Sequence, residues 1–191
     1  MKRLILASAS PRRVALLQQV GYEPLVCPSR FAEEAVVPGE NPTDYVKRQA
    51  LQKAREVADR QPDDCVVLAA DTVVVMDNEI IGKPADASAA MAILQRLSGA
   101  RHFVLTGVAI ISARTQWQTC VATTVYMRPL PEALVSWYVG TGEPLDKAGA
   151  YGIQGKGALL VEKIEGCYFN VVGLPLAAIA DRLAQSGVGR A

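Results

Sequence analysis

The first part of the chain alternates short apolar runs with amphipathic runs, a pattern that predicts strands and helices in turn. Ser10 and Asn41 each precede a proline and an amphipathic run. Both residue types are good helix N-caps, and proline suits the first helical position. The expected elements are strands at 3–7 and 23–27, helices at 11–20 and 42–60, and a Pro- and Glu-rich loop at 28–41.

A continuous apolar run at 65–70 predicts a strand that is buried on both faces and that ends in Asp71. Apolar residues resume to position 76, and Asp77-Asn78 then predicts a two-residue hairpin turn with a returning strand at 79–81. Counting across that turn pairs Met76 with Glu79, Val74 with Ile81 and Thr72 with Lys83. The count therefore predicts that Lys83 lies beside Asp71.

The second half of the chain mixes helices with hairpins, so the fold class predicted is α/β or α+β with a mixed sheet. The expected elements are helices at 86–98, 131–139 and 174–185, and strands at 102–112, 117–127, 158–165 and 167–172. A loop dense in glycine fills positions 140–157. Loops of this length inside a compact domain are usually functional.

Composition excludes several classes of protein. Among the 191 residues, 20 Lys and Arg face 19 Asp and Glu, and this balance argues against a general nucleic-acid binder. No apolar run approaches the roughly 20 residues that a membrane span needs, and the N-terminal apolar run is too short for a signal peptide. The four cysteines form no CxxC pair, which argues against a zinc site. We expect a cytoplasmic protein with reduced cysteines.

The chain carries no GxxxxGK[ST], GxGxxG or GxSxG motif, and it has a single histidine, His102, for which we favour a structural role. What remains are polar side chains at the ends of apolar segments. They are Ser8, Ser10, Arg12, Arg13, Glu34, Lys53, Asp71 and Lys83. Cations together with carboxylates predict a polyanion bound with a hard divalent metal, Mg²⁺ or Mn²⁺.

Each candidate also has a structural interpretation. Arg12 and Arg13 would then be solvated helix residues and Lys53, at the edge of an apolar stripe, would extend past the core to water. Glu34 would be a solvated loop acid. Asp71 is the hardest to explain in this way, because a carboxylate at the end of a buried strand needs a partner.

Motifs along nearly the whole chain resemble the Maf family of nucleoside triphosphate pyrophosphatases, in the branch that acts on dTTP and UTP. They are SASPRR at 8–13, the acidic pair 33–34, QKA at 52–54, ADT at 70–72, GKP at 82–84, TGV at 106–108, DKAGAYGIQG at 146–155 and VGLP at 172–175. The resemblance implies one Maf/Ham1-like (ITPase-like) α/β domain over 1–191, an elongated mixed sheet flanked by helices, with two lobes around a deep cleft. It also implies a divalent metal, hydrolysis to monophosphate and pyrophosphate, and a homodimer.

The resemblance also assigns roles to individual residues. Asp71 matches the catalytic aspartate, either as general base or as metal ligand. Glu34, with Glu33 as second choice, matches a loop glutamate that we expect to hold the metal with Asp71. Phosphate-binding positions match Arg12, Arg13, Lys53 and Lys83, and positions tied to base selection match Arg12, Thr72 and Gln154; Ser8 and Ser10 add hydroxyls for substrate. Two alternatives stay open: the same reaction on methylated GTP, and a non-catalytic nucleotide-binding regulator of cell division.

Overall fold

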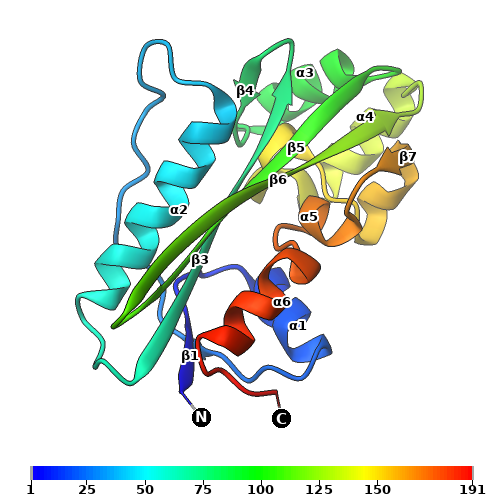
Figure 1. The fold of residues 1–191 in the computed structure, drawn as a ribbon. Helices are drawn as coiled ribbons and strands as arrows, with labels where there is room; N and C mark the ends of the chain where they lie inside the picture. The colour runs from blue at the N-terminus through cyan, green and yellow to red at the C-terminus, as the bar shows by residue number, and fades with distance from the viewer. Residues whose placement is uncertain (1, 191) are drawn as a thin grey trace. The chain divides into compact units, whose positions relative to one another are not determined.

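The computed structural model describes residues 2–190 (Figure 1), and within that range the strands form a seven-stranded mixed sheet. The strands are β1 (Arg3–Leu6), β2 (Leu25–Val26), β3 (Cys65–Met76), β4 (Glu79–Ile81), β5 (Arg101–Ser112), β6 (Thr115–Met127) and β7 (Val161–Glu165). Their hydrogen-bonded order is β2-β1-β3-β5-β6-β7, with β4 added to β3. The pairs β1/β2 and β1/β3 are parallel, whereas β3/β4 and β6/β7 are antiparallel.

The helices are α1 (Pro11–Gln19), α2 (Pro42–Ala58), α3 (Ala87–Leu97), α4 (Glu132–Gly140), α5 (Tyr168–Val172) and α6 (Leu176–Gln185). Three short 3₁₀ helices, η1 (Glu143–Asp146), η2 (Ala148–Ala150) and η3 (Gly155–Leu160), occupy the glycine-dense loop. Contacts divide the chain into two compact units. Unit 1 holds the described residues up to 71, then 106–121 and those from 173 on; unit 2 holds 72–105 and 122–172. The single domain expected over 1–191 stays a prediction.

In unit 1, helices cover both faces of the parallel strands. Ile5 on β1, Val67 on β3 and Ala50 on α2 belong to one buried cluster, so α2 packs against one face of these strands. Helices α1 and α6 lie on the opposite side of β1 (Figure 1), and their inward leucines, Leu17 and Leu183, are fully buried. Burying a side chain of this size stabilises the fold by about 1.5–3 kcal/mol.

A close helix–strand contact in unit 1 explains the TGV motif. A Cβ added to Gly107 on β5 would lie 2.2 Å from the backbone oxygen of Val46 on α2, a distance that real Cβ atoms do not reach. Only glycine therefore permits α2 to approach β5 this closely. Since α2 also carries Lys53, the motif helps to fix the helix that positions this lysine.

In unit 2, helices α3 and α4 and the glycine-dense loop share one core. Leu94 on α3, Val135 on α4 and Tyr151 in the loop belong to a single buried cluster that also contains Val74 on β3. The hairpin at Asp77-Asn78 forms in the predicted register, with Met76 opposite Glu79 and Val74 opposite Ile81. The loop that the sequence singled out is therefore a packed part of this unit.

Three sequence predictions of local structure are wrong. The strand expected over 158–165 begins only at Val161, because residues 158–160 belong to η3. The segment 167–172, expected as a strand, forms α5 instead. The amide of the buried Asn170 donates to the carbonyl of Val104 at 2.9 Å and to Thr123 Oγ1 at 3.0 Å, and these tertiary contacts outweigh the β-preference of the neighbouring apolar residues. The predicted pairing of Thr72 with Lys83 is also absent, because β4 ends at Ile81.

The caps predicted at Ser10 and Asn41 are both confirmed in position, but only one of these two makes the expected bond. Asn41 caps α2 and its Oδ1 accepts a hydrogen bond from the backbone N–H of Asp44 at 2.9 Å. Ser10 occupies the cap position of α1, yet its side chain makes no capping bond. Among residues 2–190, no helix has both the length and the apolar character that crossing a membrane requires.

Candidate active site

The candidate site of unit 1 centres on Lys53, which extends from α2 to two carboxylates. Its Nζ donates to Asp71 Oδ1 at 2.6 Å and to Glu33 Oε1 at 2.7 Å. The Lys53 and Asp71 side chains are only 13% and 9% exposed, so most of the water around this pair is excluded. Of the two interpretations of Lys53, the structure therefore supports the one in which its ammonium points toward other charged groups rather than toward bulk water.

The two acids of the loop before α2 have different partners. Glu33 reaches Lys53, whereas the carboxylate of Glu34 pairs with Arg48 on α2. Arg48 also makes two hydrogen bonds to Glu40, at 2.8 and 2.7 Å, and these bonds raise its pKa. The structure thus brings Glu33, the second choice of the sequence analysis, into the cluster with Asp71, and it places the first choice, Glu34, on a different cation.

Gln49 on α2 fixes the backbone at these two acids and so determines which of them faces Lys53. Its fully buried amide donates from Nε2 to the backbone carbonyl of Glu34 at 2.9 Å and accepts from the backbone N–H of the same residue at 3.4 Å. This pair of bonds holds the backbone at Glu34, so that the preceding side chain is the one that faces Lys53. Sequence reasoning missed Gln49, because a glutamine within a helix carries no signal of its contacts.

The loop before α1 and the first turn of α1 carry the second group of predicted residues. Arg13 Nη1 donates to Ser8 Oγ at 3.0 Å, and Arg13 Nε donates to the carbonyl of Gly173 at 2.8 Å. Ser8 Oγ also accepts from the backbone N–H of Ser10 at 3.2 Å. Arg12, the neighbouring cation, is half-buried. Serine hydroxyls and guanidinium groups therefore gather at the N-terminus of α1, where a helix favours anions.

The two groups of unit 1 influence each other electrostatically. Burial lowers the pKa of Arg13, the charges of Asp71 and Glu33 oppose this shift, and the charge of Arg12 adds to it. Burial, together with the charges of Asp71 and Glu33, also raises the pKa of Tyr45 on α2. Tyr45 is a neighbour of the carboxylates that the sequence analysis did not identify.

Unit 2 holds Thr72, Lys83 and Gln154. Thr72 is half-buried on β3, Lys83 is exposed after β4, and Gln154 is exposed just before η3. The backbone N–H of Gly149 donates to the carbonyl of Gly82 at 3.0 Å, so the segment next to Lys83 is tied to the loop that carries Gln154. Within unit 2, this bond connects a predicted phosphate-binding segment with the predicted base-reading loop.

His102 has a structural environment in unit 2, as expected from the sequence. It is buried on β5, and its Nε2 lies 2.6 Å from Tyr151 Oη in the loop. Burial lowers its pKa to about 4, so the imidazole is neutral at physiological pH. The four cysteines are free, as predicted, but only Cys65 is buried; Cys27, Cys120 and Cys167 are half-buried.

The arrangement of the acidic residues shows whether they could bind the divalent metal that the sequence predicts. Within residues 2–190, no three His, Cys, Asp or Glu side chains gather as a metal cluster. Asp71 and Glu33, however, both direct an oxygen at the single cationic nitrogen of Lys53. Two converging carboxylates suit Mg²⁺, which often binds through one or two protein carboxylates and completes its shell with substrate phosphates and water. The donor set therefore fits the expected metal.

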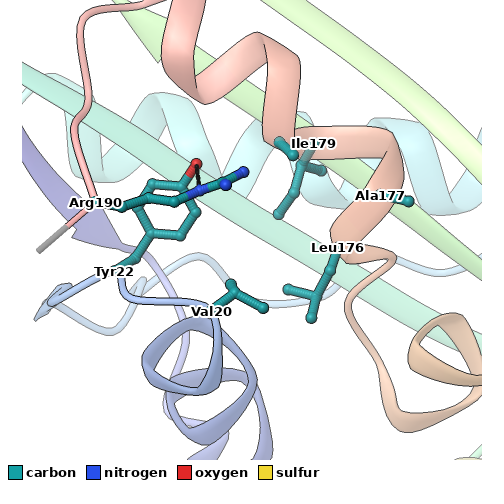
Figure 2. A pocket seen from close by; sticks show the side chains of 7 residues that line it. Val20, Tyr22, Leu176, Ala177, Ile179 and Arg190 are labelled. Atoms are coloured by element: carbon teal, nitrogen blue, oxygen red, sulfur yellow. Dashed lines mark hydrogen bonds between the residues drawn. The ribbon is translucent and has the colours of Figure 1, made fainter.

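A separate hollow in unit 1 lies between the end of α1 and α6 (Figure 2). Its walls include Val20, Leu176 and Ile179, and Arg190 Nε donates to Tyr22 Oη at 3.3 Å at its edge. This mainly apolar lining contains one cation and no carboxylate, so it does not suit a metal-bound triphosphate.

Known proteins match the chain over almost its full length. A family model described as Maf-like protein matches residues 3–186. A relative from Symbiobacterium thermophilum named dTTP/UTP pyrophosphatase is 50% identical over 187 residues, which cover 98% of this chain and 95% of the relative. A relative of the same name from Dictyoglomus turgidum is 48% identical and covers 97% of both chains.

A solved structure has a similar fold. The HAM1 protein from Coxiella burnetii is 15% identical, and the match has a TM-score of 0.53 and covers 97% of this chain and 100% of that one. This likeness concerns the fold alone, and with the mixed sheet and its flanking helices it confirms the predicted Maf/Ham1-like fold class; the two-lobed cleft stays a prediction. From the family model and these relatives, we conclude that the chain belongs to the Maf family of proteins.

Proposed function

We propose that this protein hydrolyses dTTP and UTP to the nucleoside monophosphate and pyrophosphate. Relatives of about half-identical sequence and matching length bear the name of this activity. The observation in the structure that carries the proposal is the position of Lys53, whose ammonium lies between the buried Asp71 and the exposed Glu33. A protein that only bound phosphate would gain nothing from carboxylates placed there, because they repel the ligand.

We further propose that Asp71 and Glu33 hold a divalent metal, Mg²⁺ or Mn²⁺. Their convergence on one cation supports this assignment, and the pairing of Glu34 with Arg48 favours Glu33 over Glu34 as the second ligand. When bound, such a metal polarises a phosphoryl oxygen and acidifies water. A direct test is to measure the affinity for Mn²⁺ by electron paramagnetic resonance. We expect Glu33→Gln to weaken Mn²⁺ binding strongly and Glu34→Gln to leave it nearly unchanged.

The side chains of unit 1 supply the remaining parts of the reaction. Water forms a bond to the α-phosphorus, the bridging bond to the β-phosphate breaks, and pyrophosphate leaves. Asp71 accepts the proton from that water or helps to position it. Lys53 and Arg13 offset the negative charge that moves onto the leaving pyrophosphate, and they do so more effectively in a partly desolvated site than in water. The resemblance assigns the same task to Arg12 and Lys83.

We propose that Gln154 reads the base. An amide offers one donor and one acceptor, which is the pattern that the C=O and N–H edge of uracil and thymine can satisfy. The exposed position of Gln154 leaves its amide accessible. We expect Gln154→Ala to raise the KM for dTTP and UTP more than the KM for other triphosphates. An equal effect on every triphosphate would remove Gln154 from this role.

One experiment separates the candidate functions. Pyrophosphate release is measured with dTTP, UTP, methylated GTP and the other common triphosphates, with and without Mg²⁺. We expect metal-dependent release that is fastest with dTTP and UTP. Preference for methylated GTP would favour the other branch of the family. Absence of turnover with every triphosphate, combined with nucleotide binding, would support the non-catalytic regulator.

A further inference from the structure

The segment that carries Gln154 forms a small closed loop in unit 2. A Cβ added to Gly157 would lie 2.0 Å from the backbone oxygen of Gly152, so the two ends of the segment 152–157 touch and only glycine fits at this contact. Gln154 lies between these ends and is exposed. The backbone on both sides of Gln154 is therefore constrained within a few residues.

A single carboxylate secures one end of this loop. Glu143 Oε1 accepts a hydrogen bond from the backbone N–H of Gly157 at 3.1 Å, and Glu143 Oε2 accepts one from the backbone N–H of Lys156 at 3.2 Å. Hydrogen bonds from backbone N–H groups to a charged carboxylate are stronger than those to neutral acceptors. Glu143 itself belongs to η1, within the same glycine-dense region.

A buried hydroxyl secures the other end. Tyr138 on α4 is fully buried, and its Oη accepts a hydrogen bond from the backbone N–H of Gly152 at 3.1 Å while donating to Glu143 Oε1 at 3.0 Å. The Tyr138 hydroxyl therefore joins the two anchor points into one network. Because α4 packs in the core of unit 2, this network attaches the loop to a rigid element.

We propose that Glu143 and Tyr138 are positioning residues that determine base selectivity by fixing the backbone that presents Gln154. This inference rests on the proposed role of Gln154 as the base reader. The Glu143 carboxylate touches the loop on the C-terminal side of Gln154 and the Tyr138 hydroxyl touches it on the N-terminal side, so neither residue needs to touch the nucleotide. Loss of either contact frees the amide to rotate away from the orientation that matches a uracil or thymine edge.

A double-mutant cycle between Glu143 and Gln154 tests the proposal. The kcat/KM values for UTP and GTP are measured in the wild type, Glu143→Ala, Gln154→Ala and the double variant. We expect Glu143→Ala to lower the ratio of UTP to GTP about tenfold, mainly through the KM for UTP, since a lost polar contact to the base is a discrimination effect. In the Gln154→Ala background, we expect the same change to alter the ratio less than about twofold, because coupled residues are not additive.

Further variants make the result independent of folding. A ratio of two substrates is unaffected by the fraction of active protein, so a merely structural role for Glu143 would lower both rates equally. Glu143→Gln, which keeps one acceptor oxygen, should lose less selectivity than Glu143→Ala, and Tyr138→Phe should lose selectivity in the same direction. Glu132→Ala, an exposed acid at the start of α4, is the matched control and should leave the ratio unchanged.

The outcomes are distinct. A tenfold loss of selectivity that disappears in the Gln154→Ala background supports the proposal. Suppose that Gln154→Ala lowers the ratio of kcat/KM for UTP to that for GTP. If Glu143→Ala then lowers kcat/KM for both substrates equally, or if the effects of the two substitutions on the ratio are additive, the positioning role of Glu143 is overturned while Gln154 remains the base reader. If Gln154→Ala itself lowers kcat/KM for every triphosphate equally, Gln154 is not the base reader, and the positioning role of Glu143 and Tyr138 is overturned as well.

Discussion

The carboxylate cluster of unit 1 and the Gln154 loop of unit 2 hold their polar groups in different ways. Asp71 lies on the long strand β3 and Lys53 on the long helix α2, so regular elements place both groups. Gln154 lies in an irregular segment, and side chains from elsewhere in the unit, Glu143 and Tyr138, restrain its backbone. The Asp71–Lys53 pair therefore relies on backbone hydrogen bonding and packing, whereas the Gln154 segment relies on a small network of polar side chains.

This difference has a functional consequence. Chemistry at phosphorus requires charges at fixed positions, and long elements packed in a core provide such positions at little additional cost. In the proposed mechanism, base selectivity depends on the orientation of the Gln154 amide, which a loop can change without disturbing the core. We therefore expect substitutions in the carboxylate cluster of unit 1 to lower turnover strongly, and substitutions in the loop of unit 2 to alter substrate choice.

The largest effect is expected for Asp71→Asn. The substitution keeps the shape of the side chain but removes the charge that binds Lys53 and that we propose acts on water or metal, so kcat for dTTP should fall about 1000-fold. Circular dichroism should show an unchanged fold. Asp64→Asn is the matched control, since Asp64 precedes β3, is exposed and pairs with Arg3. Near-normal turnover by Asp71→Asn would overturn the assignment.

A smaller effect should distinguish the two loop acids. Glu33→Gln removes a carboxylate that shares Lys53 with Asp71, and we expect kcat/KM for dTTP with Mg²⁺ to fall about 100-fold. Glu34→Gln removes a carboxylate that pairs with Arg48 and not with Lys53, and we expect a change of less than about threefold. The reverse order of effects would restore Glu34 as the acid that acts with Asp71.

The third effect concerns the stability of unit 2 and its pH dependence. Burial lowers the pKa of His102 to about 4, so the unfolded chain binds a proton below pH 6.5 while the folded protein does not. Stability should therefore fall as the pH decreases from 6.5 toward 4, by about 2 kcal/mol at pH 5 relative to pH 7.5. His102 is the single histidine of the chain, so His102→Gln removes this contribution alone. Equal pH dependence of urea unfolding in both proteins would contradict a buried neutral imidazole.

Much of the fold follows from local patterns in the sequence. The cap at Asn41 and the two-residue turn at Asp77-Asn78 are determined by neighbours a few residues away, and the structure confirms both. The segment 167–172 was predicted wrongly because its conformation depends on the distant partners of Asn170, Val104 and Thr123. Local preference indicates a strand there, and tertiary hydrogen bonds produce a helix.

The candidate site shows the same division. Periodicity predicts that Lys53 lies at the edge of the buried face of α2, and burial of the strand before Asp71 indicates that this carboxylate needs a partner. The sequence names Lys83 as the neighbour of Asp71, whereas the hydrogen-bond partner in the structure is Lys53. The sequence could not predict which of Glu33 and Glu34 contacts Lys53, because this depends on the bonds that the Gln49 amide and Arg48 make to Glu34. The hydrogen bonds of Tyr138 and Glu143 likewise depend on how the loop folds.

The proposed reaction requires that water attacks the α-phosphorus of dTTP or UTP. Hydrolysis of dTTP in water enriched in ¹⁸O, followed by mass spectrometry of both products, tests it directly. We expect one ¹⁸O atom in the thymidine monophosphate and none in the pyrophosphate. Label in the pyrophosphate, or release of inorganic phosphate with the nucleoside diphosphate as the other product, would contradict it.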